Sequence, residues 1–228
     1  DNVENLNEMF INTPMLVGSG FVYKHEKNKT FILTSNHVCR GINSYLRFQS
    51  LLTSSKEEVL KSVSESKKYR HLDFVQIKSN YNLNAVVTLF DFNGNQYRDI
   101  KVKKQGISED LCIIESYNII GRPVAFSENN CEYGEEIVNV SASDGNYFPT
   151  AVPYHIGAYS GNIKNKRFGL MGKGEDIALY TLDIEQGSSG SAVFSKKTKK
   201  VCGNINATMK KTNLTIGITS NGIKEFIR

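Results

Sequence analysis

The chain is built from short apolar runs, each separated from the next by polar residues or glycine. Runs of about four to eight residues with alternating apolar positions are typical of half-buried β-strands. The pattern predicts strands at residues 15–23, 30–34, 86–92, 97–102, 111–114, 136–140, 150–159, 177–182, 191–194, 201–209 and 214–219, with a further one near Val124. Because the strands are many and short, we expect an all-β fold with little helix.

Three stretches add detail to this pattern. Asn93-Gly94 between two runs is a strong signal for a tight hairpin. In residues 54–68 a serine is followed three residues later by a glutamate, and apolar residues at 59, 60 and 63 share one helical face. We predict an amphipathic helix there, packed on the outside of a β domain rather than acting as a substrate lid. A final helix, Asn221–Ile227, is predicted after Ser220, which can cap it.

The composition is that of a globular chain, since 39% of the 228 residues are hydrophobic and 22% are charged. No apolar run approaches the roughly 18–20 residues that a membrane span requires, so no membrane association is expected. The net charge of +5 is spread along the chain, with short lysine clusters at residues 101–104 and 196–200. Because no basic helix or interleaved aromatic pattern accompanies them, these clusters indicate solvated turns, and no nucleic-acid partner is expected.

The most distinctive chemistry lies in Gly187-Ser188-Ser189-Gly190, a turn of small residues that leads into an apolar strand. A serine hydroxyl becomes a nucleophile when a base takes its proton, and the transition state needs backbone N–H groups aimed at the oxyanion. The first glycine lets the backbone present an N–H group, and the second leaves room for a substrate. This frame selects Ser189 as the candidate nucleophile over Ser188 and Ser191.

A base and an orienting carboxylate lie upstream, each at the end of an apolar run. His37 follows Phe31-Ile32-Leu33, and Asp110 opens Leu111-Cys112-Ile113-Ile114. The chain order is therefore His, Asp, Ser, whereas the α/β-hydrolases carry Ser, Asp, His. A glycine- and serine-rich turn alone would indicate an ordinary loop, and the three residue types together point to acyl transfer.

The base and the acid lie in one half of the chain and the nucleophile lies in the other. This division predicts two packed β-barrels with a site in the cleft between them. We place the domains at residues 1–118 and 119–228, with a turn at Tyr117–Pro123 as their boundary.

Four cysteines, Cys39, Cys112, Cys131 and Cys202, are too few for a disulfide-built scaffold of this length. Cys39 and Cys112 each follow a proposed catalytic residue by two positions, inside apolar runs. We interpret them as small buried core residues in preference to a disulfide or a metal pair. No Cys-x-x-Cys or His-x-x-x-His spacing supports zinc, so neither a metal nor a cofactor is expected.

Five stretches, taken together, resemble the trypsin/chymotrypsin fold and most closely the HtrA/Deg-type serine proteases. They are Gly18-Ser19-Gly20-Phe21, Thr34-Ser35-Asn36-His37-Val38, Asp110-Leu111-Cys112-Ile113-Ile114, Gly187-Ser188-Ser189-Gly190-Ser191 and the segment from Val201 to the last helix. These stretches span nearly the whole chain. The resemblance implies two packed six-stranded antiparallel β-barrels of the chymotrypsin type, with residues 54–68 as an inserted surface helix and a C-terminal helix.

By that resemblance His37 is the general base, Asp110 holds its tautomer and steadies the imidazolium, and Ser189 attacks the substrate. The N–H groups of Gly187 and Ser189 form the oxyanion hole. The segments before and after the nucleophile wall the primary specificity pocket. The substrate-binding residues expected there are Ile184, Gln186, Ile205, Asn206 and Ala207.

Specificity depends on two adjacent residues of that wall. Asp183 stands six residues before Ser189, where trypsin-like enzymes keep the acid that selects Lys or Arg. Alternation sends Asp183 and Ile184 to opposite faces, and burying an unpaired carboxylate would cost several kcal/mol. We therefore expect Ile184 to face inward and small or medium apolar residues to precede the scissile bond.

The sequence also departs from the HtrA pattern. The interval between His37 and Asp110 is long, Ser191 replaces a glycine beside the nucleophile, and the sequence ends without the PDZ module that HtrA-type proteins commonly carry. Ser188 stands where trypsin-like zymogens place an aspartate that pairs with a freed N-terminus, so activity is expected to need no such N-terminus. The predicted function is a serine endopeptidase of polypeptides that works through an acyl-enzyme, and the alternative is a catalytically inactive domain that binds peptides or proteins.

Overall fold

A computed structural model describes residues 18–42, 88–143, 151–163, 177–209 and 212–228. Almost all of them belong to one compact unit, Leu16–Cys39 together with Thr88–Arg228. The other unit, Asp1–Met15 with Arg40–Val87, is described only at residues 40–42. The helix predicted at residues 54–68 lies outside the described residues.

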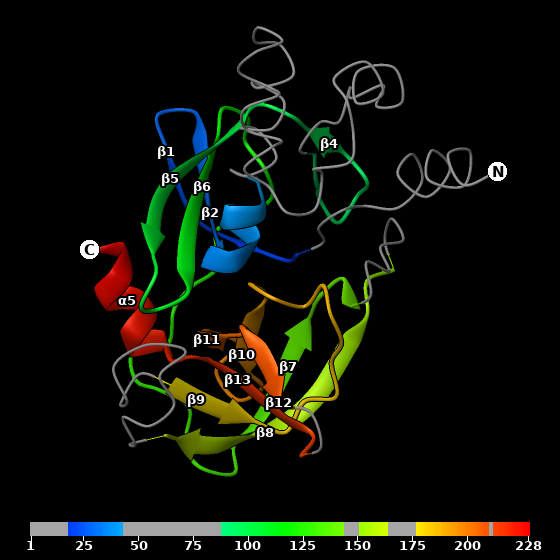
Figure 1. Cartoon of the computed structure of the whole chain (residues 1–228), viewed down its shortest axis with the longest axis vertical. Coiled ribbons are helices and arrows are strands. Elements are labelled where there is room, and N and C mark those ends of the chain that lie inside the picture. The colour runs from blue at the N-terminus through cyan, green and yellow to red at the C-terminus, as the bar shows by residue number, and fades with distance from the viewer. Residues whose placement is uncertain (1–17, 43–87, 144–150, 164–176, 210–211) are drawn as a thin grey trace, which may run out of the picture. The chain divides into compact units, whose positions relative to one another are not determined.

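The first sheet is antiparallel, with the strand order β1-β2-β6-β5 (Figure 1). Its strands are β1 (Phe21–Glu26), β2 (Lys29–Ser35), β5 (Ile100–Gly106) and β6 (Leu111–Ser116). β2 pairs with β6 along its length, from Thr30 opposite Ser116 to Ser35 opposite Leu111. These two strands confirm the predictions at residues 30–34 and 111–114, and their ends lie side by side.

The hairpin at Asn93-Gly94 is confirmed, with shorter strands than predicted. β3 (Leu89–Phe90) and β4 (Gln96–Tyr97) form a two-stranded antiparallel sheet. The Asp91 carboxylate accepts hydrogen bonds from the backbone N–H groups of Asn93 and Asn95, both at 2.9 Å, and Gly94 has a φ of 88°. The turn is longer than a two-residue one because the Asp91 side chain closes it.

The second sheet is also antiparallel, with the order β11-β10-β7-β8-β9-β13-β12. Its strands are β7 (Glu136–Val140), β8 (Tyr154–Asn162), β9 (Ile177–Tyr180), β10 (Ala192–Ser195), β11 (Val201–Asn204), β12 (Ala207–Met209) and β13 (Leu214–Ile218). All seven overlap predicted strands, so the all-β class is confirmed. The boundary near residue 118 stays a prediction, although β6 ends at Ser116 and β7 begins at Glu136.

Three strand predictions need correction. The run at residues 97–102 is divided between β4, which ends at Tyr97, and β5, which begins at Ile100. The run at residues 201–209 is split, because the chain leaves β10 and joins β13: the N–H of Ile205 donates to Ser191 O, and that of Asn206 donates to Ile216 O. Val124 lies outside the strands, and its N–H donates to Val22 O at 2.9 Å. At these last two positions the backbone changes its hydrogen-bonding partner. The pattern of apolar residues gives no sign of such a change.

The core holds two clusters of buried apolar side chains. One lies within the second sheet and includes Ile137, Tyr159, Tyr180 and Val193. The other draws on both sheets and on the C-terminal helix, with Leu33 and Leu111 from the first sheet, Ile218 from the second, and Ile223 and Phe226 from the helix. The second cluster joins the two sheets and thereby fixes the strand ends that carry the candidate site.

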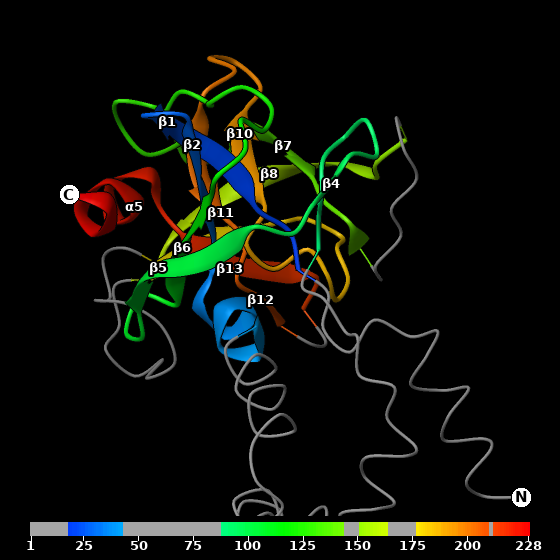
Figure 2. The same ribbon diagram turned by 90° about the horizontal axis from the view of Figure 1, so that it is seen from above.

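The C-terminal helix α5 (Ser220–Ile227) lies beside β5 in both views (Figures 1 and 2). There the ammonium of Lys104 stands 4.8 Å from the centre of the Phe226 ring. The N-cap is Thr219, whose hydroxyl accepts from the N–H of Gly222, and so the predicted cap at Ser220 is one residue late. Among the described residues, no helix is both long and apolar enough to cross a membrane.

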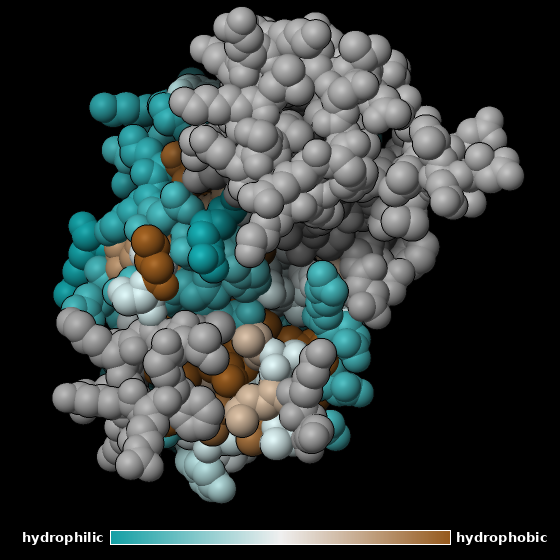
Figure 3. Space-filling model, in the orientation of Figure 1, coloured by the Kyte–Doolittle hydropathy of each residue, from teal (hydrophilic) through white to brown (hydrophobic). Residues whose placement is uncertain are grey.

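The surface differs between the two sheets. Figure 3 shows hydrophilic residues over the first sheet and a group of apolar residues over the part of the second sheet where β9, β13 and β12 lie. Half-buried apolar side chains on these strands are Leu179, Met209, Leu214 and Ile216. Because Ala178 and Tyr180 are buried in the core, β9 carries apolar side chains on both of its faces.

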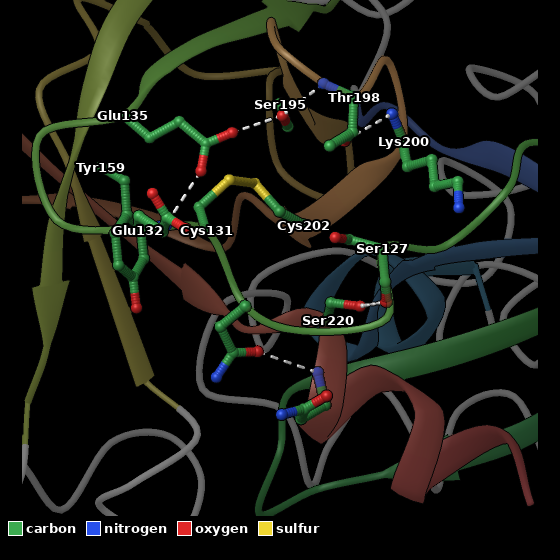
Figure 4. Close-up of a disulfide and its surroundings, with 12 residues drawn as sticks. Ser127, Cys131, Glu132, Glu135, Tyr159, Ser195, Thr198, Lys200, Cys202 and Ser220 are labelled. Atoms are coloured by element: carbon green, nitrogen blue, oxygen red, sulfur yellow. Dashed lines mark hydrogen bonds between the residues drawn. A yellow bond between two sulfur atoms is a disulfide. The ribbon is translucent and has the colours of Figure 1, made fainter.

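All four cysteines form disulfides, which corrects the interpretation of Cys39 and Cys112 as core residues without a disulfide. Cys39 is bonded to Cys112, and both are fully buried. Cys131 is bonded to Cys202 of β11, and Figure 4 shows this bond beside the turn that follows β10. In that turn the Ser195 hydroxyl donates to Glu135 and accepts from the N–H of Thr198. The burial of Cys39 and Cys112 was predicted correctly. Their pairing was not, because it depends on the register of β2 with β6.

Candidate active site

The ends of β2 and β6 bring His37 and Asp110 together. Asp110 directly precedes β6, and His37 lies on the first turn of a helix that follows β2, described over residues 36–42. The His37 Nδ1 atom is 2.8 Å from Asp110 Oδ2, and the backbone N–H of His37 donates to Asp110 Oδ1 at 2.9 Å. With Nδ1–H given to the carboxylate, the Nε2 lone pair of a neutral imidazole stays free to accept a proton.

Asp110 is held from a second direction by Asn206. The Asn206 amide Nδ2 donates to the backbone O of Asp110 at 3.0 Å and to Oδ2 at 3.3 Å. Asn206 is itself fixed, because Asn204 Nδ2 donates to its Oδ1 at 2.6 Å. The Asp110 side chain is 8% exposed and its φ is 50°, an uncommon value for a residue with a side chain. A buried, doubly held carboxylate of this kind suits an orienting role.

Ser189 lies at the same place. Its hydroxyl donates to the backbone O of Asn206 at 3.2 Å, so Asn206 contacts both Ser189 and Asp110. The carbonyl of Ser189 accepts from the N–H of Ser19 at 2.8 Å. Asn206 therefore links Ser189 to Asp110, which in turn is hydrogen-bonded to His37. That Asn206 also binds substrate stays a prediction.

The structure gives a reason for a glycine at position 190 that was not expected from the sequence. Its φ is 91°, and a Cβ atom at this position would lie 2.2 Å from Ser19 O and 2.2 Å from Thr34 Oγ1. The close approach of the chain before β1 and of β2 thus requires a glycine here. The room that it leaves for a substrate stays a prediction.

Gly187 and the two neighbouring serines shape the turn before the nucleophile. Gly187 has a φ of 97°, and its carbonyl accepts from the Ser19 hydroxyl at 2.8 Å. Within the described chain, the N–H groups of Gly187 and Ser189 donate to no protein acceptor. Ser188 and Ser191 are each 1% exposed, and the Ser191 hydroxyl donates to Ser188 O at 2.6 Å. Both side chains point into the protein, so Ser191 places no group beside the nucleophile.

The remaining expected substrate-binding residues differ in exposure. Ile184 and Ile205 are 5% and 1% exposed and belong to the core of the second sheet. Gln186 is exposed, and Ala207 is half-buried at the start of β12. Asp183 is exposed, next to the buried Ile184. The alternation expected along this segment is therefore present.

The contact of Asn206 with Asp110 is the feature of the candidate site that sequence reasoning missed. The missing signal is three-dimensional, because the split between β11 and β12 turns its side chain toward Asp110. Among the described residues, no group of three or more His, Cys, Asp or Glu side chains could hold a metal ion.

The fold is similar to that of solved proteases. The Rv3671c protease from M. tuberculosis in its active form is 14% identical, with a TM-score of 0.59 over 93% of this chain and 72% of that chain. The inactive form of the Rv3671c protease is 14% identical, with a TM-score of 0.60 over 93% of this chain and 82% of that chain. The HtrA-type protease AlgW, solved with a decapeptide, is 14% identical, with a TM-score of 0.60 over 92% of this chain and 50% of its own. This chain thus spans about half the length of AlgW, and at such identity the likeness shows the fold alone.

Comparison with curated protein sequences gives no significant match. A family model described as "Trypsin-like peptidase domain" matches residues 18–203, a range that includes His37, Asp110 and Ser189. This range is most of the chain, and its description agrees with the observed fold. The chain belongs to the trypsin-like peptidase family.

Proposed function

We propose that the chain is a serine endopeptidase that cleaves polypeptides through an acyl-enzyme, with His37, Asp110 and Ser189 as its catalytic residues. The observation that carries the proposal is the position of Asn206, hydrogen-bonded to Ser189 on one side and to Asp110 on the other, while Asp110 holds His37. Three residues far apart in the sequence are thereby grouped in the combination that acyl transfer requires.

The reaction follows from these contacts. The Ser189 hydroxyl rotates from Asn206 O toward His37, and Nε2 takes its proton as the oxygen attacks the substrate carbonyl. The oxyanion is received by the N–H groups of Gly187 and Ser189, each of which is expected to contribute about 10²–10³-fold to the rate. His37 then protonates the leaving amine, and water, deprotonated by the same imidazole, hydrolyses the acyl-enzyme.

An apolar primary specificity fits the exposed Asp183 and the buried Ile184. Thr215, fully buried, donates its hydroxyl to Leu182 O at 2.9 Å and so fixes the segment that precedes these two residues. We expect small or medium apolar residues before the scissile bond. A polypeptide ligand agrees with the decapeptide held by the similar protease AlgW.

Labelling with a peptidyl phosphonate that carries an apolar residue next to phosphorus tests the proposal. The wild type should become covalently labelled and should cleave peptides, whereas Ser189→Ala should do neither and should unfold at the wild-type temperature, since it loses one half-buried hydroxyl. Ser191→Ala is the matched control and should still be labelled, because its hydroxyl points into the protein.

The catalytically inactive binding domain is the competing function, and the hydrogen bond from the Ser189 hydroxyl to Asn206 O is the observation in its favour. A wild type that binds peptides but is neither labelled nor active would support it. Labelling of Ser191 in place of Ser189 would instead show that the nucleophile is misassigned.

A further inference from the structure

The residue before the proposed nucleophile is held by a buried group of hydroxyls. Ser188 Oγ lies 2.9 Å from Ser141 Oγ and 2.7 Å from Ser143 Oγ. Ser141 and Ser143 follow the end of β7 and are 2% and 8% exposed. Ser143 Oγ is in turn 3.3 Å from Nε2 of the half-buried His155 on β8. The Ser188 side chain is therefore satisfied by hydroxyls and needs no charged N-terminal group as its partner.

The same hairpin also holds the other side of the nucleophile. β7 and β8 are paired so that Asn139 is opposite His155, and opposite residues of a pair project from the same face of a sheet. Asn139 Nδ2 donates to Ser191 Oγ and to Ala192 O, both at 2.8 Å. Side chains of β7 and of the residues that follow it are therefore hydrogen-bonded to Ser188 and Ser191, which flank the short Ser189-Gly190 segment.

The three serine hydroxyls and His155 can form a chain of hydrogen bonds, and the hydroxyl protons set its direction. Ser141 donates to Ser188, and each hydroxyl has a single proton to give. Ser188 can then donate to Ser143, and Ser143 can donate to His155 Nε2. In this arrangement each hydroxyl donates once and the imidazole is the terminal acceptor. Without it, the Ser143 proton could turn only to Ser188 or to Ser141, whose Oγ is 3.4 Å away.

The group lies next to both N–H groups that would bind an oxyanion. Ser188 supplies the carbonyl half of the peptide whose N–H belongs to Ser189. On the other side, Ala142 donates its N–H to Ser19 Oγ at 3.1 Å, and Ser19 Oγ donates to Gly187 O at 2.8 Å. Residues 141–143 thus fix the turn through Ser188 and through Gly187 at once.

We propose that residues 141–143 and His155 position the N–H groups of Gly187 and Ser189 for the oxyanion, with His155 acting as a positioning residue through Ser143 and Ser188. This inference rests on the proposed peptidase function. His155 does not touch the reacting atoms in this arrangement, and its effect is confined to the step in which negative charge develops.

The test compares a ligand that needs the oxyanion hole with one that does not. A peptide aldehyde forms a tetrahedral adduct with the nucleophile, whereas the same peptide ending in a primary alcohol has no carbonyl carbon to attack and no anionic oxygen. His155→Phe should lower kcat and weaken aldehyde binding by a common factor of about tenfold or more, while KM and the affinity for the peptide alcohol stay within about twofold of wild type. His155→Gln, which retains an acceptor, should recover most of the loss.

Two further variants make the result decisive. Ser143→Ala cuts the link between Ser188 and His155 with a smaller change of volume and should reproduce the loss even if His155→Phe folds poorly. His25→Phe is the matched control, since the His25 ring on β1 is hydrogen-bonded to Ile120 O, away from the turn, and it should leave both ligands unaffected.

Unchanged kcat and aldehyde binding in folded His155→Phe and Ser143→Ala would overturn the positioning role. An equal loss for the aldehyde and the peptide alcohol would overturn it as well, because that result indicates general damage to peptide binding. A wild type that neither cleaves peptides nor binds the aldehyde would contradict the proposed function itself, which is a distinguishable outcome.

Discussion

Replacing Gly190 by alanine perturbs the candidate site at a closely packed point of the chain. The new Cβ atom would lie 2.2 Å from both Ser19 O and Thr34 Oγ1, and 2.8 Å from Ser35 N. Gly134 offers a matched control, because its φ of 80° is close to the 91° of Gly190 while nothing lies within 4 Å of its Cβ position. The two substitutions share the backbone strain and differ in the steric overlap.

The expected magnitudes follow from these two terms. A side chain at positive φ costs about 1–2 kcal/mol, which is the whole expected effect of Gly134→Ala on the free energy of unfolding. At Gly190 the overlap is with backbone as well as side chain, so the surrounding strands must shift by roughly 1 Å, at a further cost of about 1–3 kcal/mol. A misplacement of about 1 Å beside a nucleophile can lower the rate about 100-fold.

Urea unfolding and peptide hydrolysis, measured on the same preparations, separate the two effects. Gly134→Ala should lose stability and keep its kcat within about twofold of wild type. Gly190→Ala should lose more stability and about 100-fold in kcat at a temperature where it remains folded. Equal losses of activity in both variants, or wild-type kcat in folded Gly190→Ala, would refute the reasoning.

Four other predictions use separate measurements. In peptide hydrolysis assays, His37→Ala should lower kcat about 10²–10⁴-fold because no general base then takes the Ser189 proton, and wild-type kcat in the folded variant would contradict a histidine base. The Lys29 ammonium, 2.9 Å from a Glu115 carboxylate oxygen, lowers the pKa of the Glu115 carboxyl. The pair therefore stabilises the fold above the unfolded-state pKa, and this stability is lost as pH falls through the lower folded-state pKa. The melting temperature, measured between about pH 5 and 3, should depend less on pH in Glu115→Gln. A peptide-library screen should show apolar cleavage preferences unchanged in Asp183→Ala, and dominant cleavage after Lys or Arg would contradict them. Asn206→Ala should lower kcat/KM about tenfold, since a hydrogen bond to a charged group contributes about 1.5–3 kcal/mol, and equal activity would exclude an orienting role.

The parts of the fold that depend on local pattern could be predicted from the sequence. Alternating apolar residues gave the strands because one face of each is buried, as in β7, where Ile137 is fully buried and Glu136 is exposed. The closeness of His37 and Asp110 was foreseen for a similar reason, because each follows or precedes an apolar run. The order His, Asp, Ser along the chain then indicated the trypsin-like family, which the family model matches.

The parts that depend on register could not be predicted. The bond between Cys39 and Cys112 requires β2 to lie beside β6, and a small residue in an apolar run fits a free thiol equally well. The contact of Asn206 with Asp110 requires the break between β11 and β12. The reason for Gly190 lies in strands that are distant in the sequence, which local turn chemistry does not reveal.

The two sheets fix one another's proposed catalytic residues. From the first sheet's side, Ser19 donates its N–H to Ser189 O at 2.8 Å, and Ser35 at the end of β2 donates its hydroxyl to Ile205 O at 3.2 Å. From the second sheet's side, Asn206 donates to Asp110. Neither the proposed nucleophile nor the proposed acid is therefore positioned by its own sheet alone. This arrangement requires both sheets to be packed together, and the core cluster with Leu33 and Leu111 from one sheet and Ile218 from the other joins them.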